Sequence, residues 1–234
     1  MQIKGRTALV TGANRGLGLH FAKALLEAGA AKVYAAARNP ASVDIPGVVP
    51  IQLDVTDPAS IAAAAARASD VDLLINNAGA ADRGLLLDPQ AVDRLRGLIE
   101  TNGISLLTVT QAFAPVLKRN GGGAVVNVLS VLSWFTAPGL ATYSGSKALG
   151  WQLTNGLRQE LHGQQTRVIA VHPAYIDTDM TKGVTGPKSR PEDVVRIVLE
   201  GVEQNLEEIL VDEIGRQVKQ SLSSATPAYL ATSV

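Results

Sequence analysis

The sequence predicts an α/β fold: a doubly wound, about seven-stranded parallel sheet with helices on both faces. Two observations predict it. Apolar runs, typical of strands buried on both sides of a sheet, alternate along the chain with segments of helical period. Glycine and polar clusters follow these runs, at the strand ends where such sheets bind ligands. Because no linker, repeat or change of composition divides the 234 residues, we expect a single domain over residues 1–234.

The first half of the chain supplies four expected strands and two expected helices. The apolar runs lie at residues 6–12, 31–37, 48–55 and 71–79. Residues 18–30 have an apolar helical face and stop near Gly29, a typical helix end. Residues 57–69 begin with Asp57 as a candidate N-cap and Pro58 at the first helical position. This order of strand, helix, strand is typical of parallel sheets.

The second half continues the alternation. A long helical stretch over residues 88–120 is expected to bend near Asn102-Gly103 or at Pro115. We expect strands at 121–130, 166–173 and 207–213, and helices at 143–163 and 190–204. The tail from Ser221 to Val234 has no charged side chain, so it either docks on a neighbouring subunit or frays.

Composition excludes several classes of function. Lys plus Arg and Asp plus Glu both number 21, so there is no overall charge that calls for nucleic acid or an anionic membrane. The chain has no cysteine, which excludes disulfides and thiolate chemistry. His20, His162 and His172 lack the spacing of metal ligands, so no metal is expected. With no long apolar run, we expect a cytoplasmic protein.

The segment TGANRGLG, from Thr11 to Gly18, directly follows the first expected strand and leads into a helix. Gly12, Gly16 and Gly18 allow a tight turn, close approach of a pyrophosphate and close contact of helix and sheet. The free N–H groups at the start of the helix suit phosphate oxygens. This loop predicts a dinucleotide site of the Rossmann type.

The second strand indicates which dinucleotide binds. An acid usually ends this strand where NAD binds, but here Ala37 and Arg38 stand at its end. Arg15 adds a second guanidinium within the glycine loop, and two guanidiniums suit the 2′-phosphate of NADP(H). Alternatively, either arginine is a solvated surface residue. Asp54 follows the third strand and either bonds the adenine amino group or caps a turn with Thr56.

Tyr143 and Lys147 stand four residues apart in a segment of small residues, ATYSGSKALG. On a helix this spacing places both on one face. A nearby cation favours the phenolate and lowers the pKa of a tyrosine, which otherwise titrates near ~10. The alternative is a tyrosine that packs on a lysine stem. Asn76 and Asn77 are polar where the sheet is expected to be dry, so they need hydrogen-bond partners.

Taken together, these segments resemble the single-domain short-chain dehydrogenase/reductase family. The motifs TGANRGLG, LDVTD, NNAG, Asn102, VNVLS, YSGSK and HPAYIDT match its signatures in order, over residues 5 to about 180. The resemblance implies hydride transfer between NADP(H) and a carbonyl or a secondary alcohol. One domain would then carry both the cofactor and the substrate, a small molecule. The resemblance also implies a homodimer or homotetramer built on the two long helices.

The resemblance implies a role for each matching residue. Tyr143 is the general acid or base, Lys147 lowers its pKa and binds ribose, Ser130 polarises the substrate oxygen, and Asn102 holds a relay water. The cofactor-binding residues would be Gly12, Asn14, Arg15, Gly16, Leu17, Gly18, Arg38, Asp54, Val55, Asn77, Ala78, Gly79, Tyr143, Lys147, Pro173, Ala174, Ile176 and Thr178. Trp134, Phe135 and Tyr175 are candidates for the substrate pocket, although Trp134 and Phe135 equally suit the core, and Trp151 suits a subunit contact.

Two departures from the family pattern affect the expected site. Ala174 follows Pro173 where the family often has glycine, which narrows the backbone options of that loop. The short passage from Thr178 to Pro191 indicates an open site. Two other functions fit the same motifs: a 3-oxoacyl-thioester reductase, and a nonenzymatic NADP(H)-binding regulator, which usually lacks the tyrosine or lysine present here.

Overall fold

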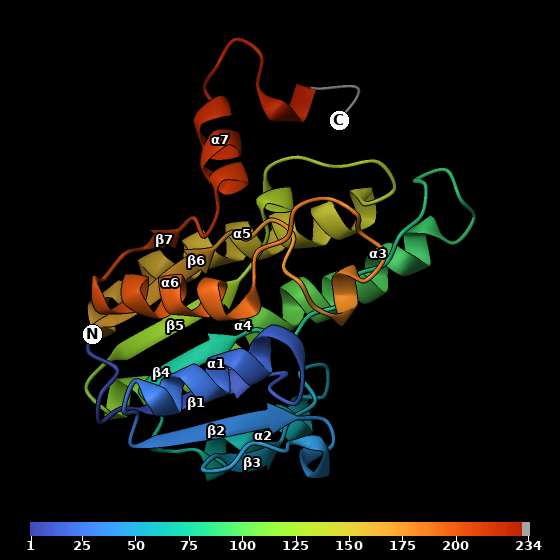
Figure 1. Ribbon diagram of the computed structural model, residues 1–234. Coiled ribbons are helices and arrows are strands. Elements are labelled where there is room, and N and C mark those ends of the chain that lie inside the picture. The colour runs from blue at the N-terminus through green and yellow to red at the C-terminus, as the bar shows by residue number, and fades with distance from the viewer. Residues whose placement is uncertain (231–234) are drawn as a thin grey trace.

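The computed structural model describes residues 1–230, and its centre is a seven-stranded parallel sheet in the order β3-β2-β1-β4-β5-β6-β7 (Figure 1). The strands are β1 (Thr7–Thr11), β2 (Lys32–Ala37), β3 (Val49–Gln52), β4 (Leu73–Asn76), β5 (Gly123–Val128), β6 (Thr166–Val171) and β7 (Glu208–Ile209). The predicted fold class, a doubly wound Rossmann-like sheet, is confirmed.

Helices cover both faces of the sheet. On one face, α1 (Gly16–Glu27) and α6 (Pro191–Glu203) share a buried apolar cluster with the strands. On the other, α2 (Pro58–Arg67), α4 (Ser105–Arg119) and α5 (Ala141–Leu161) share a second one. Strands that bury both faces must be apolar throughout, which explains the unbroken apolar runs of the sequence.

The order of the strands reverses beside β1, which pairs with β2 on one side and with β4 on the other. Chain direction is the same in every pair, so the carboxyl ends of the strands meet at one edge. Register sets Asn76 of β4 beside Asn127 of β5, and Val128 beside Val171 of β6. This edge is where doubly wound sheets bind ligands.

The expected long helix over residues 88–120 is interrupted by a π-helical turn at the first of the two places where a bend is predicted. It consists of α3 (Ala91–Ile99), a π-helical turn η2 (Glu100–Ile104) and then α4. Pro115 lies inside α4, which continues through it. A π turn frees backbone groups from the regular ladder, and such turns are frequent at functional sites.

The end of the chain differs from expectation. The last strand is only Glu208–Ile209, and a further helix, α7 (Glu213–Ser221), follows it. Asp212 caps α7 by accepting a hydrogen bond from the N–H of Gly215. Figure 1 shows α7 projecting from the body beyond β7. The predicted docking of the tail concerns residues 221–234, of which 231–234 lie outside the described residues.

Within residues 1–230, no helix is both long enough and apolar enough to cross a bilayer.

Candidate active site

The glycine loop joins β1 to α1 in the shape expected of a phosphate cradle. Gly12 and Gly16 have φ angles of +66° and +52°, a region that favours glycine. A Cβ at Gly18 would collide with the carbonyl oxygen of Gly12. Arg15 precedes the first turn of α1, and its side chain makes no capping bond there. The N–H groups at the start of α1 fit a dinucleotide pyrophosphate.

A polar clamp holds this loop to the end of β4. The Nδ2 of Asn77 donates to the carbonyl of Thr11 over 2.9 Å. In return the buried Oγ1 of Thr11 accepts from the N–H groups of Asn77 and Ala78, both at 2.9 Å. The side chain of Asn77 therefore shapes the loop, and Thr11 is a partner that the sequence analysis did not single out.

Asn76 also has the partners that its burial requires. Its Nδ2 donates to Thr110 Oγ1 over 3.1 Å and to Asn127 Oδ1 over 2.9 Å. Asn127, which is fully buried, donates in turn to Thr154 Oγ1 over 3.0 Å. This chain of amides ties β4 and β5 to α4 and α5, and so fixes the helix that carries Tyr143.

The two arginines predicted to contact the adenosine end are exposed. Within residues 1–230, the side chains of Arg15 and Arg38 form no hydrogen bond or ion pair. Asp54 Oδ1 accepts from the N–H and Oγ1 of Thr56 at 3.0 and 2.7 Å, so the turn-capping role is present. These bonds, and to a lesser extent Arg38, hold the pKa of Asp54 below its usual value.

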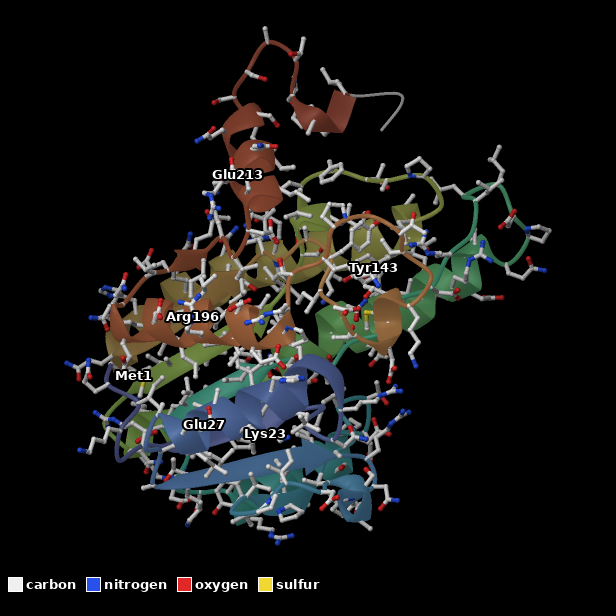
Figure 2. The ribbon with its side chains drawn as sticks, viewed as in Figure 1. Met1, Lys23, Glu27, Tyr143, Arg196 and Glu213 are labelled. Carbon is white, nitrogen blue, oxygen red and sulfur yellow. The ribbon has the colours of Figure 1, made fainter. Side chains whose placement is uncertain are left out.

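Tyr143 and Lys147 lie on one face at the start of α5, as their spacing predicts. Figure 2 shows Tyr143 in the half of the molecule that also carries Glu213, apart from Lys23 and Glu27 of α1. Lys147 is buried, and its Nζ donates to the carbonyl of Val128 over 3.0 Å. The Nζ lies 5.8 Å from the centre of the Tyr143 ring. Burial lowers the pKa of Lys147 to about 8.

The expected low pKa of the phenol is not met in this structure. Burial raises the pKa of Tyr143 to about 12, a hydrogen bond with Ser130 opposes this, and Tyr175 raises it further. Desolvation of the phenolate is the largest of these causes. The phenol is therefore in its proton-donating form at neutral pH.

Ser130 lies two residues after the end of β5 and caps the short 3₁₀ turn η3 (Val131–Ser133). Its Oγ accepts from the N–H of Leu132 over 3.1 Å and donates to the carbonyl of Pro173 over 3.4 Å. The N–H of Val131 donates to the same carbonyl over 3.0 Å. Two adjacent strand ends therefore hold the hydroxyl that faces Tyr143.

Asn102 lies in the π turn, and both the oxygen and the nitrogen of its side-chain amide have partners. Its Oδ1 accepts from the N–H of Ala80, and its Nδ2 donates to the carbonyl of Ala80 and to Ser146 Oγ, all at 2.9 Å. Ser146 also donates to the carbonyl of Tyr143 over 2.7 Å. Ser146, read from sequence only as a small neighbour, thus links Asn102 to the catalytic helix.

A small cavity lies between the π turn and the strand ends. Its volume is about 10 Å³, and Asn102, Lys147, Val55 and Val128 are among the residues that line it. This is room for about one water molecule with polar partners. The relay water stays a prediction, and this cavity beside Lys147 is where it would lie. A Cβ at Gly79 would lie 3.1 Å from Asn102 Oδ1 and 3.7 Å from Lys147 Nζ, so glycine leaves this region open.

The loop after β6 meets the glycine loop. A Cβ at Gly16 would lie 3.8 Å from Cγ2 of Thr178, which places these two predicted residues side by side. Ile176 pairs with Ser189, which closes the base of the short segment between them. The N–H of Ala174 donates to Asp212 Oδ2 over 2.8 Å. Asp212 is a partner of this loop that the sequence analysis did not identify, and contact of Ala174 with the cofactor stays a prediction.

The three candidate pocket residues lie in different surroundings. Trp134 is buried and stacks on His172, with ring centroids 3.9 Å apart, as the core alternative predicts. Phe135, like Tyr143 and Ala174, packs against a small buried cluster that includes Val131. Tyr175 is half-buried and close enough to affect the pKa of Tyr143. Phe135 and Tyr175 remain the better candidates for contact with a substrate.

Within the described residues, no group of three or more acidic or histidine side chains could hold a metal ion. Trp151 packs edge-on against Trp134, with ring centroids 6.3 Å apart.

A doubly wound sheet, a glycine cradle and a Tyr–Lys–Ser–Asn cluster at one sheet edge define a dinucleotide-dependent oxidoreductase. A family model described as short chain dehydrogenase matches residues 6–188, most of the chain. The chain belongs to the short-chain dehydrogenase family. It is therefore an oxidoreductase that acts on a carbonyl or alcohol with NAD(P).

Known proteins similar to this chain include enzymes with different substrates. Carbonyl reductase (NADPH) 2 of Sus scrofa is 35% identical over 192 residues, 79% of this chain and 78% of the pig protein. A 3-oxoacyl-(acyl-carrier-protein) reductase of Salmonella typhimurium is 31% identical over 194 residues, 79% of each chain. The crystal structure of a short chain dehydrogenase from Burkholderia cenocepacia in complex with NADP is 41% identical, with a TM-score of 0.91, and covers 96% of this chain and 95% of that one.

Proposed function

We propose that this protein is an NADP(H)-dependent carbonyl reductase that also runs in reverse as an alcohol dehydrogenase. The observation that carries the choice of cofactor is the pair of exposed guanidiniums of Arg15 and Arg38, with Ala37 where an acid would repel a 2′-phosphate. The similar Burkholderia protein was crystallised with NADP, and the similar pig enzyme is named for NADPH, which supports the same choice.

NADP(H), when bound in the glycine cradle, supplies the hydride for the reduction or accepts it in the reverse direction. Ser130 and Tyr143 orient the substrate oxygen by hydrogen bonds, and the phenol gives that oxygen its proton. Since burial keeps the pKa of Tyr143 high, the acid form required for reduction prevails at neutral pH. Lys147 and a water in the adjacent cavity would return the proton from solvent.

The cofactor choice is tested with the double variant Arg15→Ala/Arg38→Ala. Each charge-assisted bond to the 2′-phosphate is worth about 1.5–3 kcal/mol, so we expect the KM for NADPH to rise at least about tenfold. The KM for NADH is expected to stay within about twofold, because NADH has no 2′-phosphate. A control, Arg96→Ala/Arg119→Ala, removes two arginines of α3 and α4 instead. Equal effects on both cofactors would contradict the proposal.

The substrate class is tested by NADPH oxidation with ketones, aldehydes, quinones and 3-oxoacyl thioesters, each with Tyr143→Phe as control. Turnover of ketones or aldehydes that is lost in Tyr143→Phe supports the proposal. Preference for a thioester would favour the second candidate, a 3-oxoacyl-thioester reductase, which the similarity to the Salmonella enzyme favours. No turnover with any class would point to the nonenzymatic regulator. We also propose a homodimer or homotetramer built on α4 and α5.

A further inference from the structure

The backbone of Ser130 is held by a histidine that the proposed chemistry does not use. His172 is fully buried, and its Nδ1 lies 3.0 Å from the carbonyl oxygen of Ser130. A carbonyl only accepts, so the proton of the neutral ring is on Nδ1. Burial lowers the pKa of His172 to about 4, so this neutral form persists across the working pH range.

The His172 ring is clamped from the side of α7. Trp134 stacks on it at an angle of 22°, and Lys219 Nζ of α7 lies 5.0 Å from the Trp134 ring centroid. The same Nζ pairs with Glu208 Oε2 over 2.7 Å. The other Glu208 oxygen lies 3.8 Å from Nε2 of His172, which has no hydrogen-bond partner. These four side chains form a closed ring of contacts.

The clamp and the catalytic turn share further contacts with the start of α7. A Cβ at Gly215 would lie 3.2 Å from the His172 carbonyl and 3.5 Å from Cγ1 of Val131, the residue after Ser130. Asp212 ties the same helix start to Ala174. Of the charged groups in the structure, Glu208, Lys219 and Lys147 are the ones that act on His172. α7 is therefore connected to Ser130 through the stacked rings and through direct contacts with the turn that follows it.

We propose that His172 and Trp134 are positioning residues for Ser130, and that Lys219 of α7 holds their stacked rings in place. In this proposal they act through Ser130, and not by contact with the substrate or the nicotinamide. They keep the Ser130 hydroxyl where it can bond both the substrate oxygen and Tyr143. This inference rests on the proposed role of Ser130.

Lys219→Met gives the sharpest test, because the chain contains a matched control. Lys32 also lies over an aromatic ring, that of Tyr34 at 5.4 Å, and also pairs with an acid, Asp70, at 2.6 Å. The two lysine side chains are 37% and 41% exposed. Lys32→Met therefore loses the same kinds of contact, but on β2, away from Ser130.

We expect Lys219→Met to lower kcat for carbonyl reduction about three- to thirtyfold, with the KM for NADPH within about twofold. Because Ser130 opposes the rise in the pKa of Tyr143, the alkaline limb of the pH–rate profile is also expected to move to higher pH. Lys32→Met is expected to match wild type in both. If Lys219→Met also matches wild type, the inference is wrong, whereas the proposed function stands as long as wild type turns over.

Two substitutions of His172 provide an independent readout. An asparagine amide still donates a hydrogen bond near the Ser130 carbonyl, whereas leucine fills the space without a donor. His172→Asn is therefore expected to retain more of kcat than His172→Leu, by about fivefold or more, at similar thermal stability. Equal activity of the two variants would overturn the role of the hydrogen bond. If His172→Leu does not fold, Lys219→Met still decides the question.

Discussion

At the glycine loop the backbone of β1 and α1 supplies the shape of the site, whereas at Ser130 side chains from three separated segments supply it. The loop needs only residues 11–18 and the clamp of Asn77. The Ser130 end depends on Tyr143 from α5, His172 after β6, and Lys219 from α7. An added methyl group at Gly18 would collide with the backbone of the loop. At the Ser130 end, by contrast, a substitution removes one of several side-chain contacts and leaves the others in place.

The largest expected effect is that of Tyr143→Phe, which should lower kcat and leave NADPH binding nearly unchanged. Tyr143→Phe removes the proton donor and leaves the glycine loop unchanged, so kcat is expected to fall about 10²- to 10⁴-fold. The dissociation constant for NADPH, measured by fluorescence titration, is expected to change less than about threefold. Tyr229→Phe, at an exposed position in the tail, is the control. If Tyr143→Phe turns over as fast as wild type, Tyr143 is not the proton donor, and chemistry and cofactor binding cannot be assigned to the two ends in this way.

Gly18→Ala tests the tolerance of the loop. The new Cβ collides with a backbone carbonyl that cannot turn away, so we expect a loss of about 1–3 kcal/mol in the free energy of unfolding and at least about tenfold weaker NADPH binding. The control is Gly156→Ala in α5, where a Cβ meets nothing within 4 Å. There alanine should stabilise the helix by up to about 1 kcal/mol. Equal melting temperatures for the two variants would contradict this reading of the loop.

Because Lys147 is buried, we expect the free energy of unfolding to depend on pH. Burial lowers the pKa of Lys147 to about 8, so above that pH the folded protein has lost a proton that the unfolded chain still holds. Stability of wild type relative to Lys147→Met should therefore rise between pH 8 and pH 10, by about 2 kcal/mol. Urea unfolding at pH 8, 9 and 10 measures it. A flat difference would mean that Lys147 is not desolvated.

The smallest effect decides between two roles of Asp54. One of its oxygens already holds Thr56, and an asparagine can keep that bond while losing the second acceptor. If the free oxygen bonds the adenine amino group, Asp54→Asn should weaken NADPH binding about two- to tenfold with little change in melting temperature. An unchanged dissociation constant would mean that Asp54 caps the turn at Thr56 and does not bind the adenine.

The two ends also differ in how far the sequence predicts them. The glycine loop, the pairing of Tyr143 with Lys147 and the irregular turn at Asn102 all depend on neighbours within a few residues or on strand ends, and each lies at the predicted position. The spacing of Tyr143 and Lys147 does not predict the pKa of Tyr143. That pKa depends on how strongly the surrounding atoms exclude water from the phenol, which only the folded structure shows.

The contacts between α7 and the region around Ser130 were not predicted, for a different reason. Asp212 lies 38 residues from its partner Ala174, and no local pattern in the sequence connects them. A signal for α7 was present, since Asp212 is a good N-cap before a helical stretch, but the apolar run ahead of it favoured a longer strand. Trp134 and His172 each suited the core, and only the fold shows that they stack beneath the catalytic turn.

The place of α7 in the chain has a practical consequence for judging related sequences. Every signature of the family lies within the matched residues 6–188, whereas Glu208, Asp212 and Lys219 come afterwards. A homologue with complete motifs but a different C-terminal helix would pass a motif search and still turn over slowly. Conversely, α7 is a place where the rate can be tuned by substitutions that leave every reactant-contacting residue in place.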